Sequence, residues 1–237
     1  MSSDTRILAI SGLQKHYAGL RPLRIRELTL SEGERVAITG LDAAAAELLV
    51  NLITGAALPD QGTIEVLGQR TADIASGDDW LASLDRFGIV STRAVMMEGA
   101  TLAQNLAMPF TLEIDPIPDT VRARVETLAA QCGIAADRAA ALDRPAGDAP
   151  PDTRMRAHLA RAIALSPRLV LFEHPTATVP ESARRAFADD VVRVLTEKGL
   201  TALVMTEDVD FARQVGRRVL ALNGATGEMA PLRKWFF

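Results

Sequence analysis

The chain has 237 residues, enough to bury a large hydrophobic core as one domain or as a core with a subdomain. Hydrophobic residues make up 48% and charged residues 24%, and the formal net charge of -4 provides no basic surface for nucleic acid. Cys132 is the single cysteine, which excludes an internal disulfide and a cysteine-based metal cluster.

Membrane-spanning and export signals are not evident in the sequence. No stretch approaches the ~20 consecutive apolar residues that a membrane span needs. The first residues, MSSDTRILAISGL, lack the basic start, apolar centre and cleavage site of a secretion signal. We therefore expect a cytoplasmic location, with any membrane role depending on a partner.

Two short strands, Ile7–Leu13 and Leu23–Leu30, are predicted on either side of a turn at Ala18-Gly19. Between them lies Tyr17, the one tyrosine of the sequence. A lone tyrosine near a turn is most simply explained by half-buried packing.

A strand, a glycine turn and a helix follow in order, as Arg35–Thr39, Gly40 and Leu48–Thr54. This order is typical of a phosphate-binding loop, which needs glycines for close backbone approach, a lysine for the phosphates and a hydroxyl for magnesium. Of those residues only Gly40 is present. The alanines that follow it are also explained by a simple helix start, because alanine has the highest helix propensity.

The middle of the chain has turn, strand and helix signals without an obvious chemical motif. A turn and strand are predicted over Leu58–Gly68, a helix over Asp73–Leu84 and a strand over Arg86–Ser91. Two prolines then interrupt the chain, and apolar spacing predicts helices over Val121–Cys132 and Ala135–Leu142.

A buried strand, Leu169–Phe172, is predicted after a helix that Ser166-Pro167 ends, because proline disfavours helix in the residue before it. Glu173 and His174 follow where that strand emerges. In open α/β sheets the chemistry lies beyond the carboxyl ends of the strands, so these two residues are candidates for a site.

The last third of the chain continues the alternation of helices and strands. Helices are predicted over Glu181–Glu197 and Val209–Val215, with a buried strand, Thr201–Met205, between them. A terminal strand pair is predicted to begin at Arg217–Leu222.

The stretch Ala160–Ala177, ARAIALSPRLVLFEHPTA, resembles the second acidic motif of the ATP-binding subunits of ABC transporters, which carries Asp-Glu-Pro-Thr after its strand. The order and spacing of elements from Leu8 to about Glu228 resemble the same family. The resemblance implies an α/β fold of the P-loop NTPase-like ABC ATPase type, with a parallel core sheet, an N-terminal antiparallel β portion and an inserted α-helical subdomain. We expect one domain, with a core of residues 1–92 and 154–237 and a helical subdomain of residues 93–153.

At the phosphate loop the resemblance places Ala45, Ala46 and Glu47 where the family has its last glycine, its lysine and its hydroxyl. Losing a charged donor typically costs about 1.5–3 kcal/mol of binding. A carboxylate ~5 Å from a phosphate charge costs roughly 3 kcal/mol more at an effective dielectric constant of ~20. Asp42 adds a second negative charge. An acidic residue at the start of this helix would also stabilise the helix itself. We therefore expect a self-satisfied loop, whose polar groups are bonded within the chain, with Glu47 near the position that a bound anion would occupy.

The family's adenine-stacking aromatic corresponds to Tyr17, and its magnesium-sensing glutamine corresponds to Thr92, which is shorter. The signature Leu-Ser-Gly-Gly-Gln, whose amides hold phosphate from the opposing subunit, falls on a segment that includes Pro150, Pro151 and Asp152. Proline has no amide hydrogen to donate, and an aspartate repels phosphate.

The remaining family-equivalent positions are those expected to carry catalysis. Glu173 stands at the magnesium-binding acid, and its carboxylate suits that ion. His174 stands at the water-polarising glutamate and could act as a base, although a structural turn residue is the simpler interpretation. Glu207 stands at the family's histidine. His16 and His158 have no partner spacing that predicts a role.

The resemblance, with these replacements, favours a pseudo-ATPase that is a structural or regulatory subunit of a membrane transport complex. It implies no bound cofactor, or weakly bound Mg-ATP. Its expected partners are an integral membrane permease, contacted through the helical subdomain, and a second ATPase-like subunit in a homodimer or heterodimer. One alternative is a divergent subunit that binds and hydrolyses ATP to power transport, with lipid or lipoprotein as a cargo class, and another is a soluble scaffold without a membrane partner.

Overall fold

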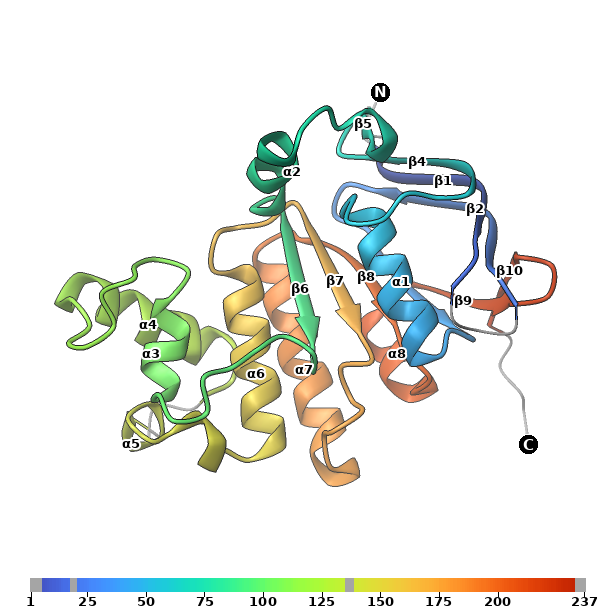
Figure 1. Ribbon diagram of the computed structural model, residues 1–237. Coiled ribbons are helices and arrows are strands. Elements are labelled where there is room, and N and C mark those ends of the chain that lie inside the picture. Colours follow the sequence, from blue (N-terminus) through green and yellow to red (C-terminus); the bar gives the residue numbers. More distant parts are fainter. Residues whose placement is uncertain (1–5, 18–20, 135–138, 233–237) are drawn as a thin grey trace.

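The computed structural model describes residues 6–17, 21–134 and 139–232, and their strands form two sheets on opposite sides of helix α1 (Ala43–Ile53) (Figure 1). The N-terminal sheet is antiparallel, with its strands in the order β2-β1-β4-β5. These strands are β1 (Arg6–Lys15), β2 (Leu23–Ser31), β4 (Gln61–Val66) and β5 (Gln69–Arg70).

The core sheet has the strand order β10-β9-β3-β8-β7-β6, in which β10 alone pairs antiparallel to its neighbour. Its strands are β3 (Arg35–Thr39), β6 (Phe87–Ser91), β7 (Leu169–Glu173), β8 (Thr201–Met205), β9 (Arg218–Asn223) and β10 (Glu228–Pro231).

Both faces of this core sheet are buried. Ile38, Leu171 and Leu203 point into one apolar cluster, which α1 and the N-terminal sheet complete. Val170 and Val204, one residue along their strands, point into a second cluster on the opposite face. Successive side chains of a strand alternate between faces, so these strands are apolar throughout rather than alternating with polar residues.

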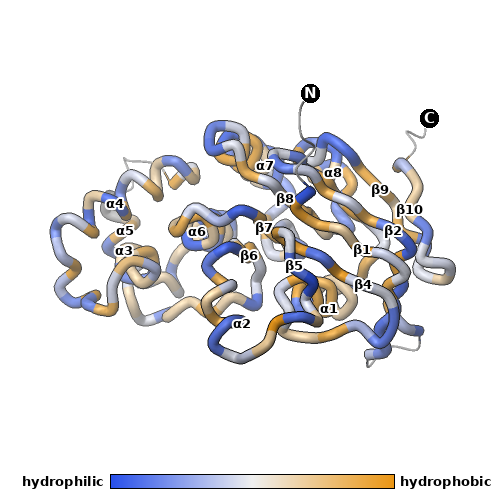
Figure 2. The backbone as a smooth tube through the Cα atoms, turned by 90° about the horizontal axis from the view of Figure 1, so that it is seen from above, coloured by the Kyte–Doolittle hydropathy of each residue, from blue (hydrophilic) through white to orange (hydrophobic). Residues whose placement is uncertain are grey.

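Helices α6 (Pro151–Ile163), α7 (Glu181–Glu197) and α8 (Val209–Val215) cover that opposite face (Figure 1). Helix α2 (Gly77–Leu84) precedes β6 and contributes no buried residue. Seen from above, the apolar stretches gather where α6, α7 and α1 meet the sheet, and the polar stretches lie mainly on the loops (Figure 2).

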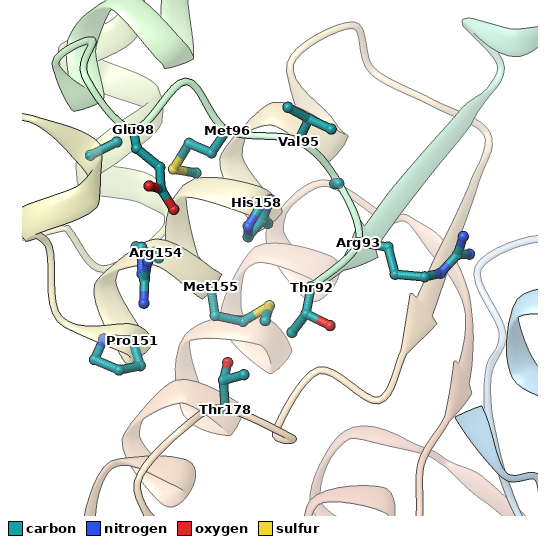
Figure 3. A pocket seen from close by; sticks show the side chains of 12 residues that line it. Thr92, Arg93, Val95, Met96, Glu98, Pro151, Arg154, Met155, His158 and Thr178 are labelled. Atoms are coloured by element: carbon teal, nitrogen blue, oxygen red, sulfur yellow. The ribbon is translucent and has the colours of Figure 1, made fainter. Parts of the chain in front are cut away.

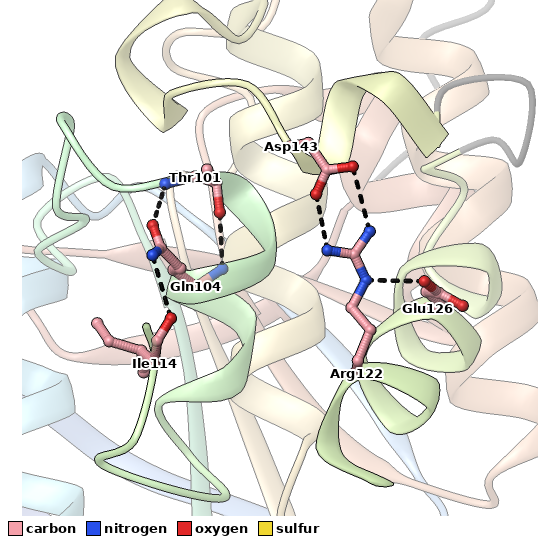
Figure 4. A network of polar contacts seen from close by, with 6 residues as sticks. All are labelled: Thr101, Gln104, Ile114, Arg122, Glu126 and Asp143. Carbon is pink, nitrogen blue, oxygen red and sulfur yellow. Dashed lines mark hydrogen bonds and ion pairs between the residues drawn. The ribbon is translucent and has the colours of Figure 1, made fainter. Parts of the chain in front are cut away.

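A separate group of helices, α3 (Leu102–Ala107), α4 (Asp119–Gln131) and α5 (Ala139–Leu142), lies beside α6, away from the N-terminal sheet (Figure 1). Thr101 and Gln104 cap α3 reciprocally, in the arrangement known as a capping box (Figure 4). Arg122 on α4 binds Asp143 at 2.7 Å and Glu126 at 2.7 Å, which joins α4 to the segment after α5 (Figure 4).

Several predicted elements have the bounds that the structure gives, including α7, α8 and β8. Two predictions need correction. The helix predicted from Leu48 begins at Ala43, because Asp42 caps it. The helix predicted over Asp73–Leu84 begins at Gly77 as α2, after a 3₁₀ turn at Thr71–Asp73, because Ser76 caps it by accepting a bond from the Asp79 amide. Of the helix predicted over Ala135–Leu142, only Ala139–Leu142 lies within the described residues, which also exclude the predicted turn at Ala18-Gly19.

The helices of the described chain are too short or too polar to cross a membrane.

Candidate functional site

The loops that follow β3, β6, β7 and β8 all begin at one edge of the core sheet. Ser91 of β6 pairs with Glu173 of β7, and Glu173 pairs with Met205 of β8. Met205 in turn pairs with Ile38 of β3. Because parallel strands end at the same edge, the residues after each of them converge, as expected for a site in this class of sheet.

The loop between β3 and α1 makes hydrogen bonds within itself. Gly40 has φ +87°, and a Cβ atom there would lie 2.6 Å from the carbonyl oxygen of Leu222, so only glycine fits. Asp42 is the N-cap of α1, and its Oδ1 accepts a bond of 2.8 Å from the Ala45 amide. The Ala46 amide donates to the Asp42 carbonyl at 2.9 Å. Asp42, and not Glu47, thus supplies the acceptors for the first amides of α1.

Glu47 instead faces an arginine that the sequence reasoning missed. Arg93 lies just after β6, and its Nη1 is 2.9 Å from Glu47 Oε1. Its Nε and Nη2 donate to Glu173 Oε1 and Oε2 at 2.7 and 2.6 Å. One guanidinium thus joins the start of α1 to the end of β7, and we call these three residues the Arg93 clamp.

The charges of the clamp stabilise one another. Hydrogen bonds to Glu173 raise the pKa of Arg93, and the charges of Glu173 and Glu47 act in the same direction. The Glu173 side chain is only 6% exposed, so the paired guanidinium offsets the cost of burying its carboxylate. Two carboxylates and one guanidinium leave the clamp with a net negative charge.

His174, which follows Glu173, is held in an unusual backbone conformation. Its φ is +42°, and its amide donates to the Met205 carbonyl at 2.8 Å. Its Nε2 is buried and has no hydrogen-bond partner among the described residues. Glu207, the other residue predicted near this edge, is exposed at the end of β8. Neither residue joins the Arg93 clamp.

Tyr17 lies close enough to the loop before α1 to interact with its charge. Burial raises the pKa of the Tyr17 hydroxyl, and the negative charge of Asp42 adds to the rise. Tyr17 is half-buried and packs against the apolar cluster on the α1 side of the sheet. Thr92, the residue before Arg93, is exposed.

The N-terminus of α6 has two prolines in its first positions. Pro150 is the N-cap residue without a side-chain cap, and Pro151 begins the helix. Asp152 accepts a bond of 2.7 Å from Arg156 Nη1 in the next turn. Arg156 also binds Asp190 of α7 through Nε at 2.9 Å. The Asp152 carboxylate is thus part of an ion pair between helices.

No group of three acidic, histidine or cysteine side chains that could hold a metal ion lies around Glu173 among the described residues. Both of its oxygens bind Arg93. The metal role predicted for Glu173 stays a prediction.

A signal for Arg93 was available in the sequence. It is a charged residue two positions after the predicted strand Arg86–Ser91, at the edge where the predicted strand before Glu173 also ends. Its partners Glu47 and Glu173 are distant along the chain, so the contacts themselves depend on the fold.

A groove of about 300 Å³ lies between β6, the end of α3 and the end of α6. Phe87, Pro109 and Leu165 are among the apolar residues that line it. The side chain of Leu165 is 47% exposed and extends this apolar surface.

A family model described as ABC transporter matches residues 23–177. The chain is 26% identical over 222 residues to the ribose import ATP-binding protein RbsA of Chelativorans sp., covering 92% of this chain and 42% of RbsA. It is 26% identical over 224 residues to the lipoprotein-releasing system ATP-binding protein LolD 1 of Caulobacter vibrioides, covering 93% of this chain and 94% of that protein.

Two solved structures share the fold with TM-scores of 0.77. One is the dimeric ATP-binding cassette MJ0796 in a post-hydrolysis state bound to ADP and Pi, which is 19% identical and covers 97% of this chain and 100% of that one. The other is cbiO1 from Clostridium perfringens, described as part of the ABC transporter complex cbiONQ, at 20% identity with 95% and 87% covered. The predicted fold class is confirmed.

Proposed function

Because the chain belongs to the ABC transporter family, we propose that it is a cassette subunit of a transport complex that keeps a structural or regulatory role without hydrolysing ATP. The Arg93 clamp is the observation that carries this proposal. The resemblance assigns the positions of Glu47 and Glu173 to magnesium coordination, and here both carboxylates bind a guanidinium instead.

The other donors near the loop also fit Mg-ATP poorly. The Ala45 amide is bonded to Asp42, and Ala46 is fully buried with a methyl group where a triphosphate would need an ammonium. A triphosphate here would meet the negative charge of Asp42 and of the clamp before it found a cation. Phosphoryl transfer depends mostly on positioning and on charge stabilisation, so few of the needed groups remain.

Pairing with another cassette subunit would not restore a complete ATP-hydrolysing site. The family's two sites form head to tail, each from one subunit's phosphate loop and the other subunit's signature segment. With an intact partner, one site would receive Pro150 and Pro151, which have no amide hydrogens. The other would receive the loop capped by Asp42.

The permease partner belongs to the same proposal, and we place it on the groove beside Leu165. An amphipathic helix from the cytoplasmic side of a permease would cover this apolar surface. The description of cbiO1 as part of a transporter complex supports such a partner, as does the release system in which LolD 1 is named. This chain would then lie at the cytoplasmic face of the membrane through that contact.

Calorimetric titration of the full chain with Mg-ATP, together with a phosphate-release assay, tests the proposal. We expect no turnover above the rate without protein and at most weak binding. Turnover that is lost in Glu173→Gln and His174→Ala would overturn the proposal, because residual activity from a contaminating ATPase would not respond to these substitutions.

A second function, a divergent subunit that binds and hydrolyses ATP to power transport, is favoured by the names of the relatives. RbsA and LolD 1 are both described as ATP-binding proteins, and the MJ0796 structure holds ADP and Pi. The comparisons taken alone favour this function over the first, whereas the Arg93 clamp favours the first. In the second function Tyr17 would stack on the base and Glu173 would release Arg93 to bind magnesium, so the same titration would give binding with turnover. Lipid or lipoprotein would be a cargo class to test.

A soluble scaffold without a membrane partner is the remaining alternative. It predicts that the chain stays in the supernatant when membranes of its own organism are sedimented, whereas both transport functions predict that part of it sediments with them.

A further inference from the structure

A second cavity lies on the other side of the loop that carries Arg93. Its volume is about 380 Å³, within the range of roughly 300–1,000 Å³ that is usual for small-molecule sites. It is lined by the 92–98 segment, the first turns of α6 and Thr178 (Figure 3). Arg93 points away from it, toward the clamp (Figure 3).

His158 is a polar residue in the wall of this cavity. Its side chain lies against the cavity (Figure 3), and the residue is only 8% exposed. No described residue gives its ring a hydrogen bond or an ion pair. Burial lowers the pKa of His158 to about 4, with Arg161 and Arg154 adding to the shift, so the imidazole is neutral and offers one donor and one acceptor. Its ring nitrogens are not among the enclosed polar atoms without a partner, so they are open to the cavity and accessible to a ligand there.

Two unpaired charges of opposite sign line the same cavity. Arg154 is half-buried on α6, and its guanidinium makes no ion pair with a described residue. Glu98 is exposed on the facing loop and is likewise unpaired among the described side chains (Figure 3). Met96 and Met155 supply an apolar, adaptable surface between them (Figure 3).

We propose that this cavity binds a small zwitterion with an apolar side chain, of the class of the α-amino acids. Its carboxylate would pair with Arg154, its ammonium with Glu98, and its side chain would contact Met96 and Met155. His158 would hydrogen-bond to either charged group. The inference does not depend on the proposed function, although the 92–98 segment that would contact the ligand also carries Arg93.

Methyl NMR of the full chain labelled at methionine tests the site, with leucine as the probe. We expect saturable shifts of the Met96 and Met155 methyl signals, while the signal of Met205, which is buried in the core sheet, stays in place. Arg154→Gln and Glu98→Gln should each weaken leucine binding about tenfold, because each removes a hydrogen bond to a charged group. Arg144→Gln, at an exposed arginine outside the cavity, should leave it unchanged.

Two leucine analogues separate the contributions of the ammonium and of the carboxylate to binding. 4-Methylpentanoate lacks the ammonium and 3-methylbutylamine lacks the carboxylate, and both should bind at least about tenfold more weakly than leucine. His158→Phe should also weaken binding, with an unchanged Met205 signal as evidence that the variant is folded. Shifts that do not saturate, equal binding of the three compounds, or equal effects of Arg154→Gln and Arg144→Gln would each overturn the proposal.

Discussion

Arg93 and Glu173 form a two-bond fork, in which Nε and Nη2 of the guanidinium donate to the two carboxylate oxygens at 2.7 and 2.6 Å. Charge-assisted pairs of this geometry are among the stronger polar contacts in proteins. The fork brings the segment after β6 onto the end of β7, and the contact of Arg93 with Glu47 extends it to α1. We therefore expect the clamp to contribute to the free energy of unfolding, and this contribution can be measured separately from any effect of the clamp on nucleotide binding.

Arg93→Ala should lower the free energy of unfolding by about 1–2 kcal/mol, because it leaves the buried Glu173 carboxylate without its partner. We place the effect in this range because the Arg93 side chain is 42% exposed, so water screens part of the interaction. Urea unfolding of both proteins gives the difference directly.

A matched control is Arg26→Ala, which removes an ion pair with Glu228 whose two side chains are 66% and 56% exposed. It should change the free energy of unfolding by less than about 0.5 kcal/mol. Equal effects of Arg93→Ala and Arg26→Ala would mean that the clamp has no special energetic role. Adding Glu173→Gln to Arg93→Ala should recover part of the loss, since the unpaired charge is then gone.

The fold could largely be predicted from the sequence, since its elements depend on local signals. Val209–Val215 matches α8, and Asp208 caps that helix at the predicted start. The strands Leu169–Phe172 and Thr201–Met205 are continuous apolar runs because they are buried on both faces. Such patterns can be read from neighbouring residues alone.

The contacts of the site depend on distant residues and were not predicted. Arg93 and Glu173 are 80 positions apart in the chain. His16, for which the sequence suggested no partner, binds Asp60 through Nδ1 at 3.0 Å across 44 positions. Local patterns set which residues reach the edge of the sheet, but the register of the strands decides which of them meet.

Asp42→Ala should destabilise the chain by about 1 kcal/mol, because the Ala45 amide at the start of α1 loses its side-chain acceptor. Asp42→Asn should retain most of that stability, because the amide oxygen of asparagine can also cap a helix. Urea unfolding of the two variants separates the hydrogen bond from the charge. A loss with Asp42→Asn as large as with Asp42→Ala would assign the effect to the negative charge.

The stability of the chain should depend on pH through His158. Its pKa is about 4 in the folded chain and near 6.5 when unfolded, so the unfolded state binds the proton first as the pH falls. This contribution to stability is complete above about pH 6.5 and is lost as the pH falls toward 4. At about 1.4 kcal/mol per pKa unit the loss reaches about 3 kcal/mol.

The comparison of His158→Gln with the wild type isolates this effect from carboxylates that titrate in the same range. Between pH 7 and pH 5, the wild type should lose more free energy of unfolding than the variant. Arg144→Gln is the control, because Arg144 is exposed and arginine does not titrate between pH 5 and pH 7. Parallel pH curves for the wild type and His158→Gln would contradict the neutral, buried state of this imidazole.

Leu165→Asp should reduce the fraction of the chain that sediments with membranes of its own organism, if a permease helix covers the groove. The Leu165 side chain is 47% exposed, so its replacement by aspartate should cost little folding stability. The reason for the loss is that a charged carboxylate would have to be desolvated in an apolar contact. Leu58→Asp is the matched control, since Leu58 is 49% exposed but does not line the groove. Equal sedimentation of both variants and the wild type would place the membrane contact elsewhere on the chain, whereas a loss confined to Leu165→Asp would locate it at the groove.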